Sequence, residues 1–199
     1  MFATGAIAFI DNEIWSDEAL NNYRDENYGD FRVRADDYLA FAPIVAVYGL
    51  ELAGVQGKHS LSDRTNILFK AEMMSFAIVT GLKVGINRTR PNGENKDSFP
   101  SGHTAQAFIS ATFLHREYGH LSPWYSIGGY AMATSVATLR VMNDKHYLSD
   151  VLYGAGIGIF MTNLAYLTHG YRRAKKIQGL TVMPTYSDGT VGVAAGLRF

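Results

Sequence analysis

Two short segments contain residue types that could do nucleophilic or acid–base chemistry. The first, FPSGHT, places Ser101, Gly102 and His103 directly in front of an apolar run that is typical of a helix. The second, KHYLSD, carries His146 and Asp150 four residues apart, so both lie on one face of a helix start. A carboxylate beside an imidazole fixes its tautomer and raises its basicity. The pair therefore fits a nucleophilic or basic histidine, a structural hydrogen bond, or two ligands of a metal ion.

Three cations flank these two segments, namely Lys83, Arg90 and Arg140. A single Lys or Arg is most often a solvated surface charge, but three of them around the same histidines favour a shared ligand. If they converge, they would repel a divalent metal ion and suit a tetrahedral oxyanion, above all phosphate, to which Arg donates paired hydrogen bonds.

The start of the helix after Ser101 strengthens the expectation of an anion site. Free backbone N–H groups and the positive end of the helix dipole bind anions at such a position. Gly102 would let the backbone approach the ligand closely, Ser101 could donate its hydroxyl, and His103 is placed to protonate a leaving oxygen.

The same residues resemble the three-part signature of the type 2 phosphatidic acid phosphatase and vanadium haloperoxidase superfamily. The positions that match it in order and spacing are Lys83, Arg90, Pro91, Pro100, Ser101, Gly102, His103, Arg140, His146 and Asp150. The usual third motif has a serine before its arginine, and this chain has Leu139 there. The departure removes one hydrogen bond and none of the main catalytic roles.

The resemblance implies a metal-independent phosphatase that hydrolyses phosphate monoesters or diphosphates, above all those of lipids, through a phosphohistidine. In that scheme His146 attacks phosphorus, Asp150 orients His146, and His103 protonates the leaving alkoxide and then activates water. The residues expected to hold the phosphoryl oxygens are Lys83, Arg90, Ser101, Gly102 and Arg140. No cofactor or metal is expected, and vanadate should inhibit as a phosphate mimic.

Other functions stay open at this stage. A soluble acid phosphatase of broad specificity would use the same residues, and a vanadium-dependent haloperoxidase would bind vanadate through His146. A phosphate-binding bundle without catalysis is favoured only if the matched residues do not converge. The histidines outside the signature match no motif and are expected to be structural: His59, His115, His120 and His169.

Composition bounds the class of protein and its partners. A chain of 199 residues with 47% apolar residues can bury one substantial core, so a single domain over residues 1–199 is expected. The 18 Lys and Arg residues balance the 18 Asp and Glu residues, which gives no reason to expect nucleic acid as a partner. Cysteine is absent, so disulfide and thiolate chemistry are excluded.

Apolar runs raise the question of a membrane. A spanning helix needs about 20 apolar residues, and only VLYGAGIGIFMTNLAYLT, residues 151–168, is long and uncharged enough. One candidate favours a buried central helix in a soluble or peripheral protein. The apolar first ten residues contain no Lys or Arg and do not resemble a secretion signal. A location in the cell envelope, periplasmic or membrane-associated, is implied by the family resemblance alone.

Capping and breaking residues predict an all-α fold, a bundle of about six helices within residues 1–179. The expected helices cover about residues 17–28, 36–53, 62–85, 103–114, 123–140 and 147–176. Ser16, Ser101 and Ser122 are expected N-caps, and Pro43 should kink or restart the second helix. The loop between the third and fourth helices, residues 86–103, is expected to carry function.

Two further expectations concern packing. In the third helix, the spacing of Leu68, Met73, Phe76 and Val79 or Thr80 predicts an apolar face. In residues 180–199, two β-leaning segments around Ser187, Asp188 and Gly189 predict a short hairpin. Because two strands alone are only marginally stable, this hairpin is expected to pack on the bundle.

Overall fold

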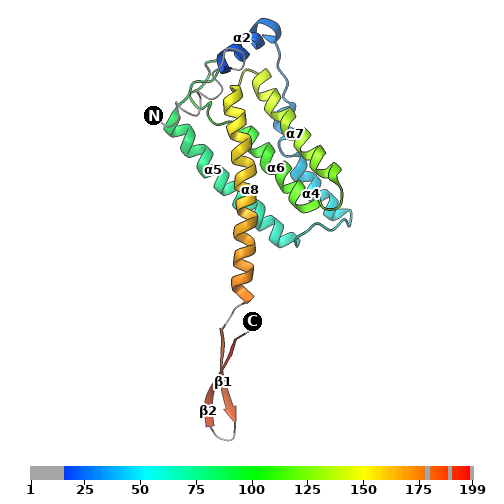
Figure 1. Cartoon of the computed structure of the whole chain (residues 1–199), viewed down its shortest axis with the longest axis vertical. Coiled ribbons are helices and arrows are strands. Elements are labelled where there is room, and N and C mark those ends of the chain that lie inside the picture. Colours follow the sequence, from blue (N-terminus) through cyan, green and yellow to red (C-terminus); the bar gives the residue numbers. More distant parts are fainter. Residues whose placement is uncertain (1–15, 178–179, 188–189, 198–199) are drawn as a thin grey trace.

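The computed structural model describes residues 16–177, 180–187 and 190–197, with side chains placed as far as Gly170. Within these residues seven helices form one bundle (Figure 1), so the predicted helical bundle is confirmed, with one helix more than expected. The helices are α2 (Asp17–Tyr28), α3 (Ala35–Leu39), α4 (Ala42–Leu52), α5 (Leu61–Ile86), α6 (Gly102–Tyr118), α7 (Pro123–Met142) and α8 (Leu148–Ile177).

The additional helix arises where the second expected helix divides. Residues 36–53 form α3 and α4, which are separated at Ala40 and Phe41. Pro43 is the second residue of α4, a position where its missing N–H group would have had no helical acceptor. Proline therefore restarts the helix, one of the two outcomes that the sequence predicted.

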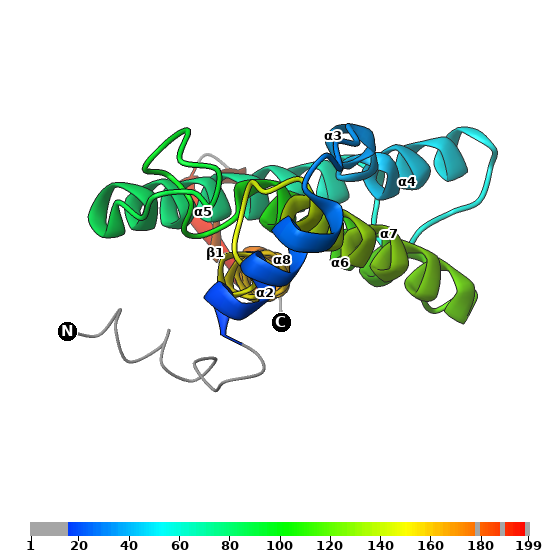
Figure 2. The ribbon, with the colours of Figure 1, turned by 90° about the horizontal axis from the view of Figure 1, so that it is seen from above.

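Helix α6 forms the centre of the bundle. It contacts α4, α5, α7 and α8, and seen from above it lies among these four helices (Figure 2). Most of its side chains are small or apolar and buried. Its first turn is capped by Ser101, whose hydroxyl accepts a hydrogen bond from the backbone N–H of Thr104 (3.4 Å), as predicted.

Two glycines of α8 allow this helix to approach α6 closely. A side chain at Gly154 would place its Cβ 2.5 Å from the carbonyl oxygen of Ser101, and one at Gly158 would place it 2.4 Å from that of Ala105. Neither distance is possible for a real carbon atom, so only glycine fits. The start of α6, which carries the predicted anion site, is therefore held directly against the first turns of α8.

The predicted apolar face of α5 is only partly buried, since Val79 is buried and Leu68 packs against the core. Met73 and Phe76 are exposed, whereas the side chains buried against the bundle are Arg64, Ile67, Ala71, Ser75 and Val79. The physical reason is that α5 carries apolar residues on two faces. Spacing alone does not identify the face that contacts protein.

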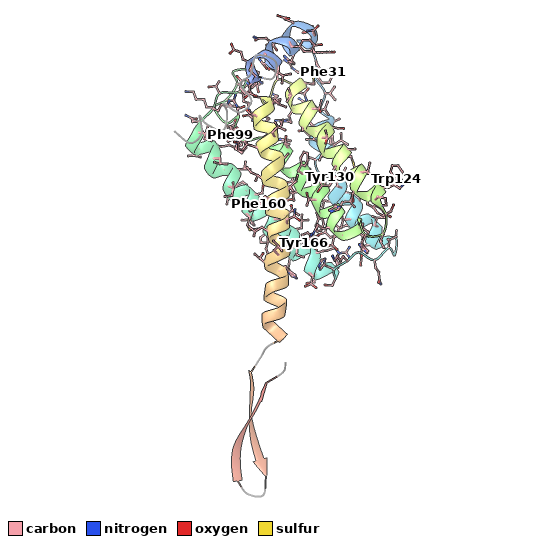
Figure 3. All side chains as sticks on the ribbon, in the orientation of Figure 1. Phe31, Phe99, Trp124, Tyr130, Phe160 and Tyr166 are labelled. Carbon is pink, nitrogen blue, oxygen red and sulfur yellow. The ribbon has the colours of Figure 1, made fainter. Side chains whose placement is uncertain are left out.

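Helix α8 also differs from its expected place as a buried central helix. The segment Leu148–Gly170 is apolar and long enough to cross a membrane. Only 33% of an apolar 18-residue stretch within it is buried. Leu152, Phe160 and Leu167 are all more than half exposed, and Figure 3 shows Phe160 on the open face of α8.

The C-terminal segment contains two antiparallel strands, β1 (Leu180–Ser187) and β2 (Thr190–Leu197). They lie beyond the end of α8, away from the other helices (Figure 1). The prediction of a hairpin packed on the bundle is therefore not supported.

Candidate active site

The predicted site residues gather at the end of the bundle where α6 and α8 begin and α7 ends. A cavity of about 500 Å³ opens there, and Arg90, His103 and Arg140 line it. These three come from the loop before α6, from the first turn of α6 and from the last turn of α7. Each of the three parts of the signature thus contributes a side chain to this end of the molecule.

His146 is buried, and its ring is held in one orientation. Its Nδ1 atom lies 2.8 Å from the backbone carbonyl oxygen of Ser98. Because a carbonyl oxygen can only accept, Nδ1 must carry the proton, which leaves the lone pair on Nε2. Burial, opposed by Asp150 and aided by the charge of Arg140, lowers the pKa of His146 to about 4. The ring is therefore neutral at the pH values at which most proteins work and can act as a nucleophile.

Asp150 acts on His146 mainly through Ser98. Its Oδ2 atom is 3.7 Å from His146 Nδ1, which is longer than a hydrogen bond. The same carboxylate accepts hydrogen bonds from the Ser98 hydroxyl and, at 2.9 Å, from the backbone N–H of Tyr147. Asp150 thus positions Ser98, and Ser98 contacts the imidazole. The direct hydrogen bond between His146 and Asp150 that the spacing predicts is replaced by an indirect contact through Ser98.

Arg88 completes this cluster and was not predicted from the sequence. Its guanidinium donates to Asp150 Oδ1 (2.8 Å), to Ser149 Oγ (2.7 Å) and to Asp17 Oδ2 (2.8 Å). It also stacks over the ring of Tyr147, 4.0 Å from its centroid. The partners lie about 60 to 70 residues away in the chain, so no local spacing could identify them. The only signal was the place of Arg88 in the charged loop beside Arg90.

The cations of the signature are paired with carboxylates. Lys83 Nζ donates to the backbone oxygen of Asp97 and lies 3.5 Å from its carboxylate, and Arg90 Nη2 donates to the same carboxylate at 3.2 Å. Lys83 and Arg90 are thus brought together by Asp97, whose side chain is 45% exposed. An exposed carboxylate on two cations occupies a position that suits a phosphoryl oxygen.

Arg140 is paired in the same way. Its Nη1 atom donates to Asp36 Oδ2 at 2.9 Å, and both side chains are buried. The buried Nε–H group of Arg140 has no hydrogen-bond partner among the described residues. A buried donor without an acceptor costs free energy, which an anionic ligand in the cavity would recover.

His103 borders the cavity and is 44% exposed. Its Nε2 atom lies 3.2 Å from Asp37 Oδ1. Burial and the neighbouring charge of Arg140 lower the pKa of His103, while Asp37 and Asp36 oppose this effect. The side chain is placed to exchange a proton with a group bound in the cavity.

Ser101 and Gly102 do not line this cavity. The Ser101 side chain is fully buried, and its backbone N–H donates to the carbonyl oxygen of Asp150 at 3.0 Å. Gly102 borders a smaller cavity of about 130 Å³ on the α5 side, together with Glu72 and Gln106. Ser101 thus joins the second part of the signature to the third, and the contact of Ser101 and Gly102 with phosphate stays a prediction.

Three of the histidines outside the signature contact side chains that hold helices and loops together. His59 Nδ1 pairs with Glu117 (2.8 Å), His115 Nδ1 with Ser126 (2.7 Å) and His169 Nε2 with Asp63 (3.1 Å). Within the described part of the chain, no three or more His, Asp or Glu side chains are grouped as metal ligands. The expectation that no metal or cofactor is needed stays a prediction.

Solved structures with the same fold come from two bacteria. A crystal structure of Aquifex aeolicus LpxE shares 23% sequence identity, with a TM-score of 0.54 over 73% of this chain and 93% of that one. The structure of the first transmembrane PAP2 type phosphatidylglycerolphosphate phosphatase from Bacillus subtilis shares 20% identity, with a TM-score of 0.54 over 87% and 93% of the two chains. At these identities the likeness shows the fold.

Sequence comparison identifies a relative and a family. A lipid A 1-phosphatase of Porphyromonas gingivalis is 30% identical over 197 residues, a match that covers 92% of this chain and 42% of the relative. The chain thus spans less than half the length of that relative. The family model of the PAP2 superfamily matches residues 65–174, which is more than half of this chain. Those residues contain all three parts of the signature, and the chain belongs to the PAP2 superfamily.

Proposed function

We propose that this protein is a lipid phosphatase that hydrolyses phosphate monoesters or diphosphates through a phosphohistidine at His146. The observation that carries the proposal is the hydrogen bond from His146 Nδ1 to the Ser98 carbonyl oxygen, which leaves Nε2 unprotonated. The positive charges of Arg140 and Arg90 lower the pKa of the same ring. A nucleophile beside cations that suit phosphoryl oxygens supports phosphoryl transfer.

The proposed reaction has two steps. His146 Nε2 attacks phosphorus while the ester P–O bond breaks, and protonated His103 gives its proton to the leaving alkoxide. Neutral His103 then takes a proton from water, which attacks the phosphohistidine, and the products are inorganic phosphate and neutral His146. Lys83, Arg90 and Arg140 stabilise the charge on the phosphoryl oxygens in both steps.

Exposed apolar side chains support a lipid substrate. On α5, Phe69, Met73 and Phe76 follow one another at helical spacing and are at least half exposed. On α8, an open apolar groove is lined by Leu152, Tyr153, Gly156, Ile157 and Phe160. Large patches of exposed apolar residues mark sites that bind membranes or other proteins. We propose that these faces lie against lipid and that the protein works in the cell envelope.

The names of the related proteins point in the same direction. The Porphyromonas gingivalis relative is a lipid A 1-phosphatase, and the Bacillus subtilis structure is that of a transmembrane phosphatidylglycerolphosphate phosphatase. Both substrates are phosphorylated lipids. We extend this substrate class, without a choice of lipid, to the present chain.

The proposal is tested with purified protein, a micellar lipid phosphate and a water-soluble phosphomonoester. We expect His146→Ala to lower phosphate release from the lipid by about 10³-fold or more, since a nucleophile and its intermediate are lost. His115→Ala removes a histidine at the other end of α6 and serves as the matched control. Vanadate should inhibit the wild type, and EDTA should leave its rate unchanged.

Each part of the proposal has its own contradicting outcome. Equal rates for wild type and His146→Ala would exclude the phosphohistidine. Turnover of the soluble ester alone would favour a broad-specificity acid phosphatase over a lipid phosphatase. Loss of activity in EDTA that Mg²⁺ restores would show that the reaction needs a metal ion.

A further inference from the structure

One wall of the catalytic cavity comes from outside the region that the family model matches. The segment from Arg32 to Asp37 contributes Arg32, Val33, Arg34, Asp36 and Asp37 to the cavity lining. The family model begins only at residue 65. This wall is therefore a feature that the family signature does not describe.

The two carboxylates of this wall are paired with signature residues, whereas its two guanidinium groups are not. Asp36 is paired with Arg140 and Asp37 with His103, so the carboxylates of the wall face the signature residues. The Arg34 side chain has no hydrogen bond or ion pair with any described residue. Arg32 donates only to the backbone oxygens of Gly29 and Phe31, at 3.2 and 2.6 Å. Arg32 and Arg34 thus line the cavity with no carboxylate of the described chain within ion-pair distance of either guanidinium group, although the charge of Arg32 also acts on Asp144.

A third cation borders the same side of the cavity. Lys145 lies in the turn between α7 and α8 and lines the cavity. Its Nζ atom is 2.8 Å from Glu94 Oε2, in an exposed pair. Exposed pairs of this kind are weak, so Lys145 can turn to a bound anion at little cost.

The cavity is larger than one phosphate group needs. Its volume is about 500 Å³, whereas a water molecule occupies about 30 Å³ in the liquid. One phosphate held by Arg90 and Arg140 would therefore leave room for a second group of the same size beside it.

The wall is fixed to the end of α7. The backbone N–H of Val33 donates to Asn143 Oδ1 (2.9 Å), and Asn143 Nδ2 donates back to the carbonyl oxygen of Val33 (2.7 Å). Asn143 caps the helix that carries Arg140. The segment that bears Arg32 and Arg34 is thus held in place relative to the signature cations, and a ligand need not order it.

We propose that Arg34, together with Arg32 and Lys145, forms a second anion subsite that binds another phosphoryl group of the substrate. Arg is suited to this role because its planar donors match phosphate oxygens. The preferred substrate would then carry two phosphoryl groups, either adjacent in a diphosphate or on separate parts of one molecule. This inference rests on the proposed function.

Binding to the His146→Ala variant tests the subsite without turnover. Isothermal titration calorimetry compares inorganic phosphate, methylenediphosphonate and glucose 1,6-bisphosphate. We expect at least one of the two-phosphoryl probes to bind about 10- to 100-fold more tightly than phosphate, as hydrogen bonds between charged groups allow. The tighter of the two shows whether the second phosphoryl group is adjacent or remote.

Arg34→Ala in the same background should remove most of that preference while phosphate affinity changes less than about twofold. Arg34→Gln keeps the length of an exposed side chain and should behave in the same way. Lys58→Ala, which removes an exposed charge from the loop between α4 and α5, is the matched control and should keep the preference. Equal affinity for all three probes, or a preference that survives Arg34→Ala, overturns the subsite.

Kinetic measurements distinguish failure of the subsite proposal from failure of the proposed function. If the wild type releases phosphate from both lipid monophosphate and lipid diphosphate, the phosphatase proposal stands. Arg34→Ala should then lower kcat/KM for the diphosphate through KM and spare the monophosphate. Equal losses on both substrates would place Arg34 in the catalytic phosphate site and refute the second subsite.

Discussion

The imidazole of His146 is oriented by a backbone carbonyl, and this determines which ring nitrogen is free to react. Ser98 provides that carbonyl, and its hydroxyl donates to Asp150, which in turn accepts from Arg88 at 2.8 Å. These hydrogen bonds connect Arg88, Asp150, Ser98 and His146 into one network, whose side chains are buried or nearly so. Its members are therefore fixed relative to one another before any substrate arrives.

The two histidines predict an acidic pH optimum. His146 must be neutral to attack, so kcat/KM should rise with pH through the His146 pKa of about 4. His103 must be protonated to assist the leaving group. Burial and the charge of Arg140 lower the pKa of His103. As pH increases, kcat/KM should therefore begin to fall at a pH below 6.5, the ordinary pKa of histidine. A pH profile of kcat/KM measures both limbs.

Variants of one carboxylate test the assignment of the descending limb. Asp37 favours protonated His103, so Asp37→Asn should move that limb to lower pH and leave the ascending limb in place. Asp30→Asn, at an exposed position a few residues earlier, is the control. A flat profile, or a shift of the ascending limb instead, would contradict the roles of the two histidines.

At the scale of elements, helix starts were more predictable than packing faces. Serine caps marked the starts of α2, α6 and α7, because a hydroxyl that satisfies free N–H groups is a local effect. The buried face of α5 depends on its neighbours and was predicted only in part. Apolar residues such as Met73 and Phe76 fit a protein core and an exposed apolar surface equally well.

The contact between α6 and α8 yields a stability prediction. Gly158→Ala would force a carbon atom against the Ala105 carbonyl oxygen, where only 2.4 Å is available. We expect a destabilisation of about 1–3 kcal/mol, as for other overpacked sites, together with a lower Tm. Circular dichroism during thermal unfolding measures the change.

The control lies on the same helix two residues earlier. An added Cβ at Gly156 meets no atom within 4 Å, so Gly156→Ala should raise stability by up to about 1 kcal/mol through helix propensity. Equal Tm shifts for the two variants would show that α8 does not press against α6 as described.

For the whole molecule, the signature was readable from the sequence and its surroundings were not. The matched positions lie between Lys83 and Asp150, and their spacing sufficed to identify the family. Asp36, Asp37 and Arg34 reach the cavity from a segment far earlier in the chain. Which distant residues join a site depends on the tertiary fold, so no motif within residues 83–150 indicates them.

The arrangement of exposed apolar residues predicts how the whole protein meets its substrate. Phe76 on α5 and Phe160 on α8 are both more than 60% exposed. If these faces lie against lipid, replacement of both phenylalanines by serine should weaken sedimentation with phospholipid vesicles. Hydrolysis of a micellar lipid phosphate should fall as well, whereas a soluble phosphomonoester should be cleaved at the wild-type rate.

Leu121→Ser, in the turn between α6 and α7, removes an exposed leucine as the control. Unchanged sedimentation of the double variant would mean that these faces do not contact lipid.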